Sequence, residues 1–376
     1  MGGLTIIGSR IRPNRRHAGE SSRRTNEGPV NVLATTPPEH PLRDPRGQAL
    51  ERWLASLDSA LALDRASLEP ASNDASFRRY FRIRSGPGDT FIVMDAPPPQ
   101  EDTRPFLHAA GVFKASGVNV PAVIAADSAQ GFLLLEDFGN ATFLGRLQSD
   151  TASAPGLYRD AWRALVTMQQ ASAPGMFPAY SRELLLRELM LYPDWYLARH
   201  KDIRLDAEQT ATLHAAFERI LANNLAQPSV YVHRDYHSRN LMVLPEGRNP
   251  GILDFQDAVY GPITYDLVSL LRDAYIRWDE AQVLDWAIRY WEEARAAGLP
   301  VAADFSDFYR DFEWMGLQRH LKVLGIFARL FHRDGKPGYL ADMPLVLEYV
   351  LQVVRRYVDL APLARLIEGI EERKPG

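Results

Sequence analysis

The chain contains no cysteine, which excludes disulfide bonds, cysteine-ligated metal sites and catalysis by a thiol. It contains no apolar run that approaches the roughly 20 residues of a membrane helix, so no association with a membrane is expected. It also lacks a strong charge of either sign. The formal net charge of -4 gives no reason to expect nucleic acid as a partner. The 376 residues, 46% hydrophobic and 24% charged, are typical of a soluble protein, and we expect a cytoplasmic one.

Residues 1–45 differ from the rest of the chain because they have few large apolar side chains and are rich in arginine. Such a segment cannot bury enough apolar surface to fold, so it is predicted to be a disordered tail. Its apolar run, Leu4–Ile7, is too short for the core of a signal peptide. A basic arm that binds nucleic acid is the alternative interpretation of the same residues.

Hydrophobic periodicity predicts a small, strand-rich part over residues 46–138. A helix is expected near residues 48–61, and a hairpin over residues 76–96 turns at Gly86–Asp89. A helix over residues 103–115 and two short strands follow. These elements predict a small antiparallel lobe.

Helical spacing dominates the remainder, residues 139–376, which follows a connector near residues 136–140. Helices are predicted over residues 154–170, 182–200 and 207–226, and three short apolar strands interrupt them. The sequence therefore predicts an α+β fold with a hinge at the connector and a larger, mostly helical second lobe.

The polar residues between these short strands carry the chemistry. His233, Arg234 and Asp235 follow one apolar strand, Asn240 precedes the next, and Asp254 ends the third. A tight loop would bring the oxygen-bearing side chains of Asp235, Asn240 and Asp254 to one pocket. Phosphoryl transfer needs such a set, because one carboxylate orients the attacking hydroxyl while other oxygens hold Mg²⁺. The spacing H-R-D-x-x-x-x-N is that of a kinase catalytic loop, whereas a solvated polar turn is the alternative.

The stretches VHRDYHSRNLMV and GILDFQDAVYGPITYDLVSLL resemble the aminoglycoside phosphotransferase and choline kinase-like family, over most of the chain after about residue 50. The resemblance implies the bilobal, protein-kinase-like fold and ATP as co-substrate. It also implies Asp235 as the catalytic base, with Asn240 and Asp254 as Mg²⁺ ligands.

Three further residues take supporting roles under the same resemblance. His233 is expected to shape the loop through backbone hydrogen bonds, and Asp257 to assist through water. Asp266 is expected to brace the loop from the start of a helix.

Within the family, five stretches resemble the anomeric sugar kinases of bacterial cell-wall recycling: SFRRYFR, VMDAPP, LLLEDFG, LYPDWY and GLQRHLKVLGIFARL. This resemblance implies ATP-dependent phosphorylation of the C1 hydroxyl of N-acetylmuramate, N-acetylglucosamine or both, by a monomer whose partners are small molecules. An aminoglycoside, choline or homoserine kinase is the first alternative. A non-catalytic nucleotide-binding module and an interaction protein with a basic arm are the others.

The nucleotide site departs from the protein-kinase pattern. The chain lacks G-x-G-x-x-G and A-P-E segments, and Met94 stands where a lysine is expected on the third strand. We predict that Arg78 or Arg82 replaces that lysine, because a guanidinium suits phosphate. A solvated basic strand face is the alternative. Ser76 and Phe77 are predicted to lie in the turn over the phosphates.

The triplet Asp137-Phe138-Gly139 precedes the catalytic loop, so it is not the metal-binding D-F-G of protein kinases, which follows that loop. It is expected to end the small lobe. Glu136 and Phe138 are predicted to lie beside the adenine ring there.

The residues that bind the acceptor are predicted from position and chemistry. His237, two residues after Asp235, is placed to touch the sugar. Asp194 in LYPDWY is a candidate for a sugar hydroxyl, unless that segment packs the large lobe. Gln318, Arg319 and Lys322 lie within about one helical turn, where a cation can bind the lactyl carboxylate of N-acetylmuramate. An ordinary amphipathic helix with a charged outer face is the alternative.

Overall fold

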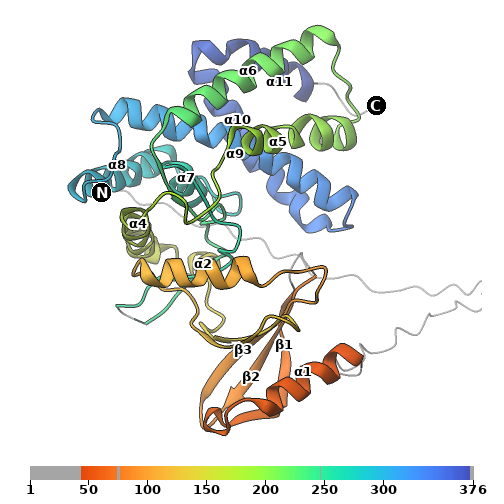
Figure 1. The fold of residues 1–376 in the computed structure, drawn as a ribbon. Coiled ribbons are helices and arrows are strands. Elements are labelled where there is room, and N and C mark those ends of the chain that lie inside the picture. The colour runs from red at the N-terminus through yellow and green to blue at the C-terminus, as the bar shows by residue number, and fades with distance from the viewer. Residues whose placement is uncertain (1–43, 74–76, 246, 373–376) are drawn as a thin grey trace, which may run out of the picture.

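The computed structural model describes residues 44–73, 77–245 and 247–372. Most of the predicted tail, residues 1–43, lies outside this part of the chain, and so does Ser76. The described residues form a five-stranded sheet beneath a larger helical part (Figure 1). The predicted α+β, kinase-like architecture is confirmed by this arrangement and by the similar structures reported below.

The sheet is antiparallel and its strand order is β1-β2-β3-β5-β4. Its strands are β1 (Leu63–Asn73), β2 (Arg79–Ser85), β3 (Asp89–Asp95), β4 (Val123–Asp127) and β5 (Phe132–Glu136). The β2–β3 hairpin turns through Gly86 and Gly88, whose φ angles of 53° and 114° suit glycine. The hairpin expected from the sequence is therefore present.

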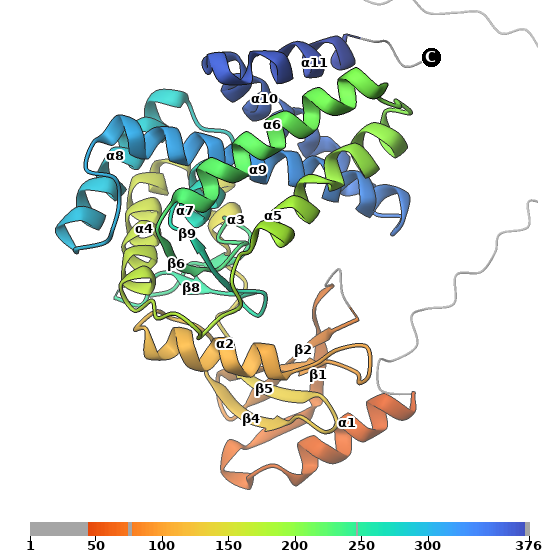
Figure 2. The ribbon, with the colours of Figure 1, turned by 45° about the horizontal axis from the view of Figure 1, so that its top comes forward.

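Two helices cover the sheet, one on each face (Figure 2). On the outer face, α1 (Pro45–Ser56) buries Leu50, Trp53 and Leu54 against a small apolar core. On the inner face, α2 (Arg104–Ala115) lies between the sheet and the helical part. Phe113 of α2 packs within 6.3 Å of the ring of Tyr231, so α2 is anchored to the helical part.

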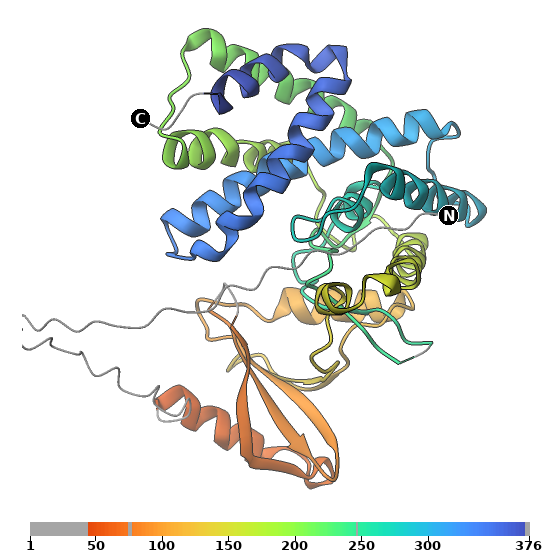
Figure 3. The same ribbon diagram turned by 180° about the vertical axis from the view of Figure 1, so that it is seen from behind.

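The helical part begins after β5 and surrounds a long central helix, α9 (Phe305–His332). Its other helices are α3 (Phe143–Ser149), α4 (Ala154–Gln170), α5 (Arg182–Leu189), α6 (Ala207–Ala226), α7 (Tyr265–Leu271), α8 (Glu280–Ala296), α10 (Met343–Arg356) and α11 (Ala361–Glu371). The 3₁₀ helices of this part are η2 (Thr151–Ser153), η4 (Pro337–Asp342) and η5 (Val358–Leu360), whereas η1 (Ser59–Leu61) lies before β1. The C-terminal helix, α11, lies on the side of the helical part away from the sheet (Figure 3).

Residues 182–200 are helical as predicted, except at a turn at Met190, but they do not form one α-helix. The α-helix α5 ends at Leu189, and a π-helix, η3 (Tyr192–His200), follows. Pro193 has no backbone N–H to continue the α-helical ladder. Tyr196 of this π-helix is 3% exposed and packs within the helical part.

Two short antiparallel ladders carry the catalytic loop. Strand β6 (Ser229–Val232) pairs with β9 (Val259–Pro262), and β7 (Leu241–Met242) pairs with β8 (Gly251–Ile252). The loop between β6 and β7 and the turn after β8 therefore meet on the side of the helical part that faces the sheet.

Candidate active site

His233 begins the catalytic loop and is fully buried. Its Nε2 lies 3.0 Å from the carbonyl oxygen of Leu253, and its Nδ1 accepts the backbone N–H of Asp235 at 3.3 Å. Burial lowers the pKa of His233 to about 4, so the ring is neutral at pH 7 and Nε2 carries the proton. These bonds join the loop to the turn after β8, as a loop-shaping residue requires.

Arg234 has a φ of 78°, a conformation that costs energy for a residue with a side chain. The buried carboxylate of Asp266, in α7, accepts the backbone N–H of His233 at 2.6 Å and that of Arg234 at 2.9 Å. Burial raises the pKa of Asp266 to about 7, while these two N–H donors act in the opposite direction. Asp266 therefore holds the strained turn that orients the next residue, Asp235.

Asp235 lies at the edge of the loop with a side chain that is 42% exposed. Its Oδ1 lies 3.7 Å from Nη2 of Arg319. Burial acts to raise the pKa of Asp235, but the positive charges of Arg319 and Lys322 outweigh it and hold that pKa well below its usual value. Asp235 is therefore an ionised acceptor that an incoming hydroxyl can reach.

Asn240 and Asp254 come together beside Asp235. The amide Nδ2 of Asn240 donates to the backbone oxygen of Asp235 at 3.0 Å and to Oδ2 of Asp254 at 3.4 Å. Asp254 has a φ of 65°, and Gln256 donates to its Oδ1 at 2.8 Å. The partly exposed carboxylate and the amide oxygen are hard ligands of the kind that Mg²⁺ takes together with phosphate oxygens, so these residues fit the cation.

A cleft of about 480 Å³ lies between the sheet and the catalytic loop. Its walls include Tyr80 and Ile92 from the sheet, and Asn240 and Asp254 from the helical part. This cleft joins the predicted metal ligands to the predicted adenine end, so it has the place and size of a nucleotide site.

The predicted adenine end of the cleft contains Glu136 and Phe138. The Arg248 guanidinium pairs with Glu136 at 2.6 Å. A Cβ at Gly251 would lie 2.5 Å from the Phe138 ring, so the glycine is needed for this close approach. Both residues remain predicted nucleotide contacts.

The cations predicted to replace the missing lysine differ in their partners. Arg82 lines the cleft, but Asp137 holds its guanidinium through bonds of 2.5 and 3.0 Å. Arg78 extends toward the metal ligands, with its Nη2 at 3.9 Å from Oδ1 of Asp254. Met94 is buried, and Phe77 is 70% exposed. Arg82 lines the cleft and Arg78 lies near the predicted metal ligand Asp254, so both remain predicted phosphate contacts.

The predicted acceptor residues are separated by the fold. His237 lies in the loop, its ring edge against Tyr275 at 5.3 Å, and burial lowers its pKa. Asp194 and Asp257 are exposed, and neither side chain is held in the network described next. These three residues remain predictions.

Gln318, Arg319 and Lys322 are buried on α9, which disproves the amphipathic helix with a charged outer face. They belong to a network around Glu188 in α5, which is 5% exposed. Its carboxylate pairs with Arg234, accepts Lys322 at 3.0 Å, and accepts the Tyr180 hydroxyl at 2.5 Å and Gln318 at 3.3 Å. The three α9 residues thus support the loop from below.

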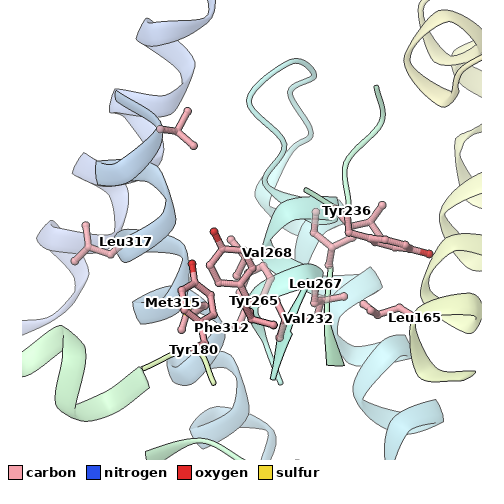
Figure 4. Packing of buried hydrophobic residues seen from close by; sticks show 14 of the residues in the cluster. Leu165, Tyr180, Val232, Tyr236, Tyr265, Leu267, Val268, Phe312, Met315 and Leu317 are labelled. Carbon is pink, nitrogen blue, oxygen red and sulfur yellow. The ribbon is translucent and has the colours of Figure 1, made fainter. Parts of the chain in front are cut away.

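Tyr265 completes this support. Arg319 donates to the Tyr265 hydroxyl at 3.2 Å and to the backbone oxygen of Arg234 at 2.7 Å, and Lys322 donates to the same hydroxyl at 3.1 Å. Tyr265 packs beside Tyr180, with ring centroids 5.2 Å apart, close to α9 (Figure 4). The catalytic loop therefore rests on buried groups from α5, α7 and α9.

The sequence interpretation missed Glu188, Tyr180 and Tyr265. One signal was present for Glu188, because it lies between Leu185 and Leu189 on the apolar face of its helix. A charged residue at a core position is rarely buried without partners. Nothing in the sequence pattern identified those partners, which come from distant segments.

A small antiparallel sheet that faces a loop across a cleft, with Asp235, Asn240 and Asp254 brought together beside that cleft, is the arrangement typical of phosphotransferases of the kinase fold. The chain belongs to the phosphotransferase enzyme family, whose family model matches residues 67–299. Membership confirms the expected family and an enzyme that phosphorylates a hydroxyl, and it implies ATP and a divalent metal ion.

Curated relatives extend this similarity over most of the chain. The chain is 50% identical over 333 residues to the N-acetylmuramate/N-acetylglucosamine kinase of Neisseria meningitidis serogroup B, covering 87% of this chain and 97% of that protein. It is 46% identical over 336 residues to the enzyme of the same name from Pseudomonas aeruginosa, covering 88% and 98%.

A solved structure supports the fold alone. Choline kinase LicA from Streptococcus pneumoniae superposes with a TM-score of 0.58 at 13% identity, covering 81% of this chain and 99% of that one. In the described part of the chain, none of the helices combines the length and apolarity needed to cross a membrane.

Proposed function

We propose that this chain transfers the γ-phosphoryl group of ATP to the anomeric (C1) hydroxyl of N-acetylmuramate, N-acetylglucosamine or both. The observation that carries the proposal is the 50% identity over 97% of the length of the meningococcal enzyme named for these two sugars. The proposed reaction uses ATP, which supports a cytoplasmic location, and Mg²⁺ is the proposed metal.

The site residues divide the work between the two substrates. The carboxylate of Asp235 accepts a hydrogen bond from the sugar hydroxyl, orients it toward the γ-phosphoryl group and takes its proton as the new bond forms. Asn240 and Asp254 would hold Mg²⁺, which supplies charge neutralisation on the phosphates. Arg78, which immediately precedes β2 and lies 3.9 Å from Asp254, would approach the same phosphates.

The buried network explains how Asp235 is positioned. Asp266 fixes the backbone before it, and Arg319 holds the carbonyl of Arg234 at 2.7 Å. Such preorganisation supports catalysis, because the base does not have to be ordered during the reaction.

The test is ADP release with Mg-ATP and a panel of N-acetylmuramate, N-acetylglucosamine, choline, homoserine and an aminoglycoside. We expect turnover with one or both amino sugars. Turnover confined to the other three acceptors would refute the proposal. Asp235→Asn should lower kcat by about two to four orders of magnitude with little change in nucleotide affinity.

A further inference from the structure

The acidic sugar proposed above carries a carboxylate on its lactyl group, and a cation at the acceptor site must compensate that charge when it is buried. Arg319 and Lys322 are poorly suited, because their side chains are 8% and 7% exposed. Both are engaged by Tyr265, and Lys322 is also paired with Glu188. A different cation is therefore needed.

Arg239 has the required position. It belongs to the same loop as Asp235 and immediately precedes Asn240, and it lines the cleft beside both predicted metal ligands. Four residues of chain span at most about 14 Å when fully extended. The loop is tighter than that, since Asn240 donates its backbone N–H to the carbonyl of His237 at 2.9 Å. Arg239 and Asp235 therefore belong to one compact loop.

The guanidinium of Arg239 is held in place but accessible. It lies over the ring of Tyr275, 3.5 Å from the ring centroid, and its side chain is 42% exposed. The backbone of this platform is fixed by the buried carboxylate of Asp273, which accepts the N–H of Ser238 at 2.9 Å and that of Tyr275 at 3.1 Å. A stacked guanidinium keeps its edge available for planar, bidentate binding of a carboxylate.

Among the described residues, the guanidinium of Arg239 has one acidic neighbour and no hydrogen bond to it. Asp342 of η4 lies 3.7 Å from Nη2, which is longer than a hydrogen bond, so a ligand carboxylate can compete for the guanidinium. Burial raises the pKa of Asp342, and Arg239 opposes that shift. His237, whose ring lies 5.3 Å from that of Tyr275 in a T-shaped contact, has its pKa lowered by burial. Arg239 is thus the accessible cation of this group.

We propose that Arg239, stacked on Tyr275, binds the carboxylate of the acidic acceptor sugar and sets the preference for N-acetylmuramate over N-acetylglucosamine. The inference rests on the proposed function. The sugar ring would then lie between Arg239 and Asp235, next to His237 of the same loop. This divides the loop into a catalytic residue at one end and a specificity residue at the other.

The experiment measures kcat/KM for both sugars with the wild type, Arg239→Gln and Arg239→Lys. N-acetylmuramate carries the lactyl carboxylate and N-acetylglucosamine does not, so the ratio of their kcat/KM values reports how the enzyme treats that carboxylate. We expect Arg239→Gln to lower the ratio for the acidic over the neutral sugar at least about tenfold, and Arg239→Lys to lower it less. Arg289→Gln, at an exposed arginine paired with Asp285 in α8, is the matched control and should leave the ratio unchanged.

Three results would overturn the inference. One is a ratio within about twofold of the wild type in Arg239→Gln, and another is an equal loss with both sugars accompanied by a raised KM for ATP, which would assign Arg239 to the phosphates. The third is a wild type that phosphorylates N-acetylglucosamine alone. A wild type that phosphorylates neither sugar would instead refute the proposed function, so the two failures are distinguishable.

Discussion

The substitution Glu188→Gln tests whether the buried network supports the catalytic loop. Glu188 is 5% exposed and holds two cations, Arg234 and Lys322, whose side chains are 19% and 7% exposed. Glutamine keeps the shape but removes the charge, so two cations lose their compensation inside the protein. Breaking a buried pair in this way costs about 3–5 kcal/mol. The free energy of unfolding should fall by that amount, and kcat should fall because Arg234 precedes the base.

The matched control is Glu218→Gln. Glu218 forms an exposed pair with Arg182 at 2.5 Å, and such pairs contribute about 0–1 kcal/mol. Urea unfolding followed by tryptophan fluorescence gives both values. A double variant, Glu188→Gln with Lys322→Met, removes one uncompensated cation and should be more stable than Glu188→Gln alone. Equal stabilities for Glu188→Gln and Glu218→Gln would refute the reasoning.

Three further predictions concern the cleft, the packing of α9 and acid stability. Arg78→Ala should raise the KM for ATP about tenfold or more. Arg82→Ala should raise it less, because the Arg82 guanidinium is already paired with Asp137. A near-normal KM for ATP in both variants would show that neither arginine binds phosphate. Gly325→Ala should destabilise the protein by about 1–3 kcal/mol, because the added Cβ would lie 2.4 Å from the Leu191 backbone. Gly369→Ala in α11 should stabilise it by about 0.5–1 kcal/mol, because a Cβ there has no described atom within 4 Å. Unfolding midpoints that do not separate in this order would contradict the packing. Burial lowers the pKa of His320 from 6.5 to about 3, so the stability that its neutral ring contributes is complete above pH 6.5 and is lost as pH falls toward 3. His320→Gln should flatten that loss by up to about 1.4 kcal/mol per pH unit in urea unfolding at each pH, and an unchanged slope would contradict the burial.

The catalytic loop could be predicted because its chemistry is local in sequence. Asp235 and Asn240 are five residues apart, and short apolar strands bracket them. Asp254 was predicted as well, because it ends the next strand. The spacing alone therefore brought three residues of the candidate site together.

The buried network could not be predicted because its partners are distant in sequence. Glu188 and Lys322 come from α5 and α9, and only the tertiary fold brings them into contact. The charged residues of α9 were interpreted through helical periodicity as a surface or a substrate site. Periodicity failed there because α9 is central, with every residue from Phe312 to Gly325 buried.

Two elements were missed for reasons of local chemistry. Strand β1 contains Pro70 and pairs with β2 through two register shifts, so it lacks the regular alternation by which strands are recognised. Strand β9 contains Gly261 and Pro262, which predict a turn. Tertiary pairing overrides the local preference at both places.

The position of the new phosphate tests the central claim most directly. ³¹P NMR of the product formed from Mg-ATP and each amino sugar distinguishes a phosphate on C1, which couples to the anomeric proton, from a phosphate on another carbon. We predict a C1 phosphate with the wild type and none with Asp235→Asn. A phosphate on another carbon, or full product formation by Asp235→Asn, would contradict the account.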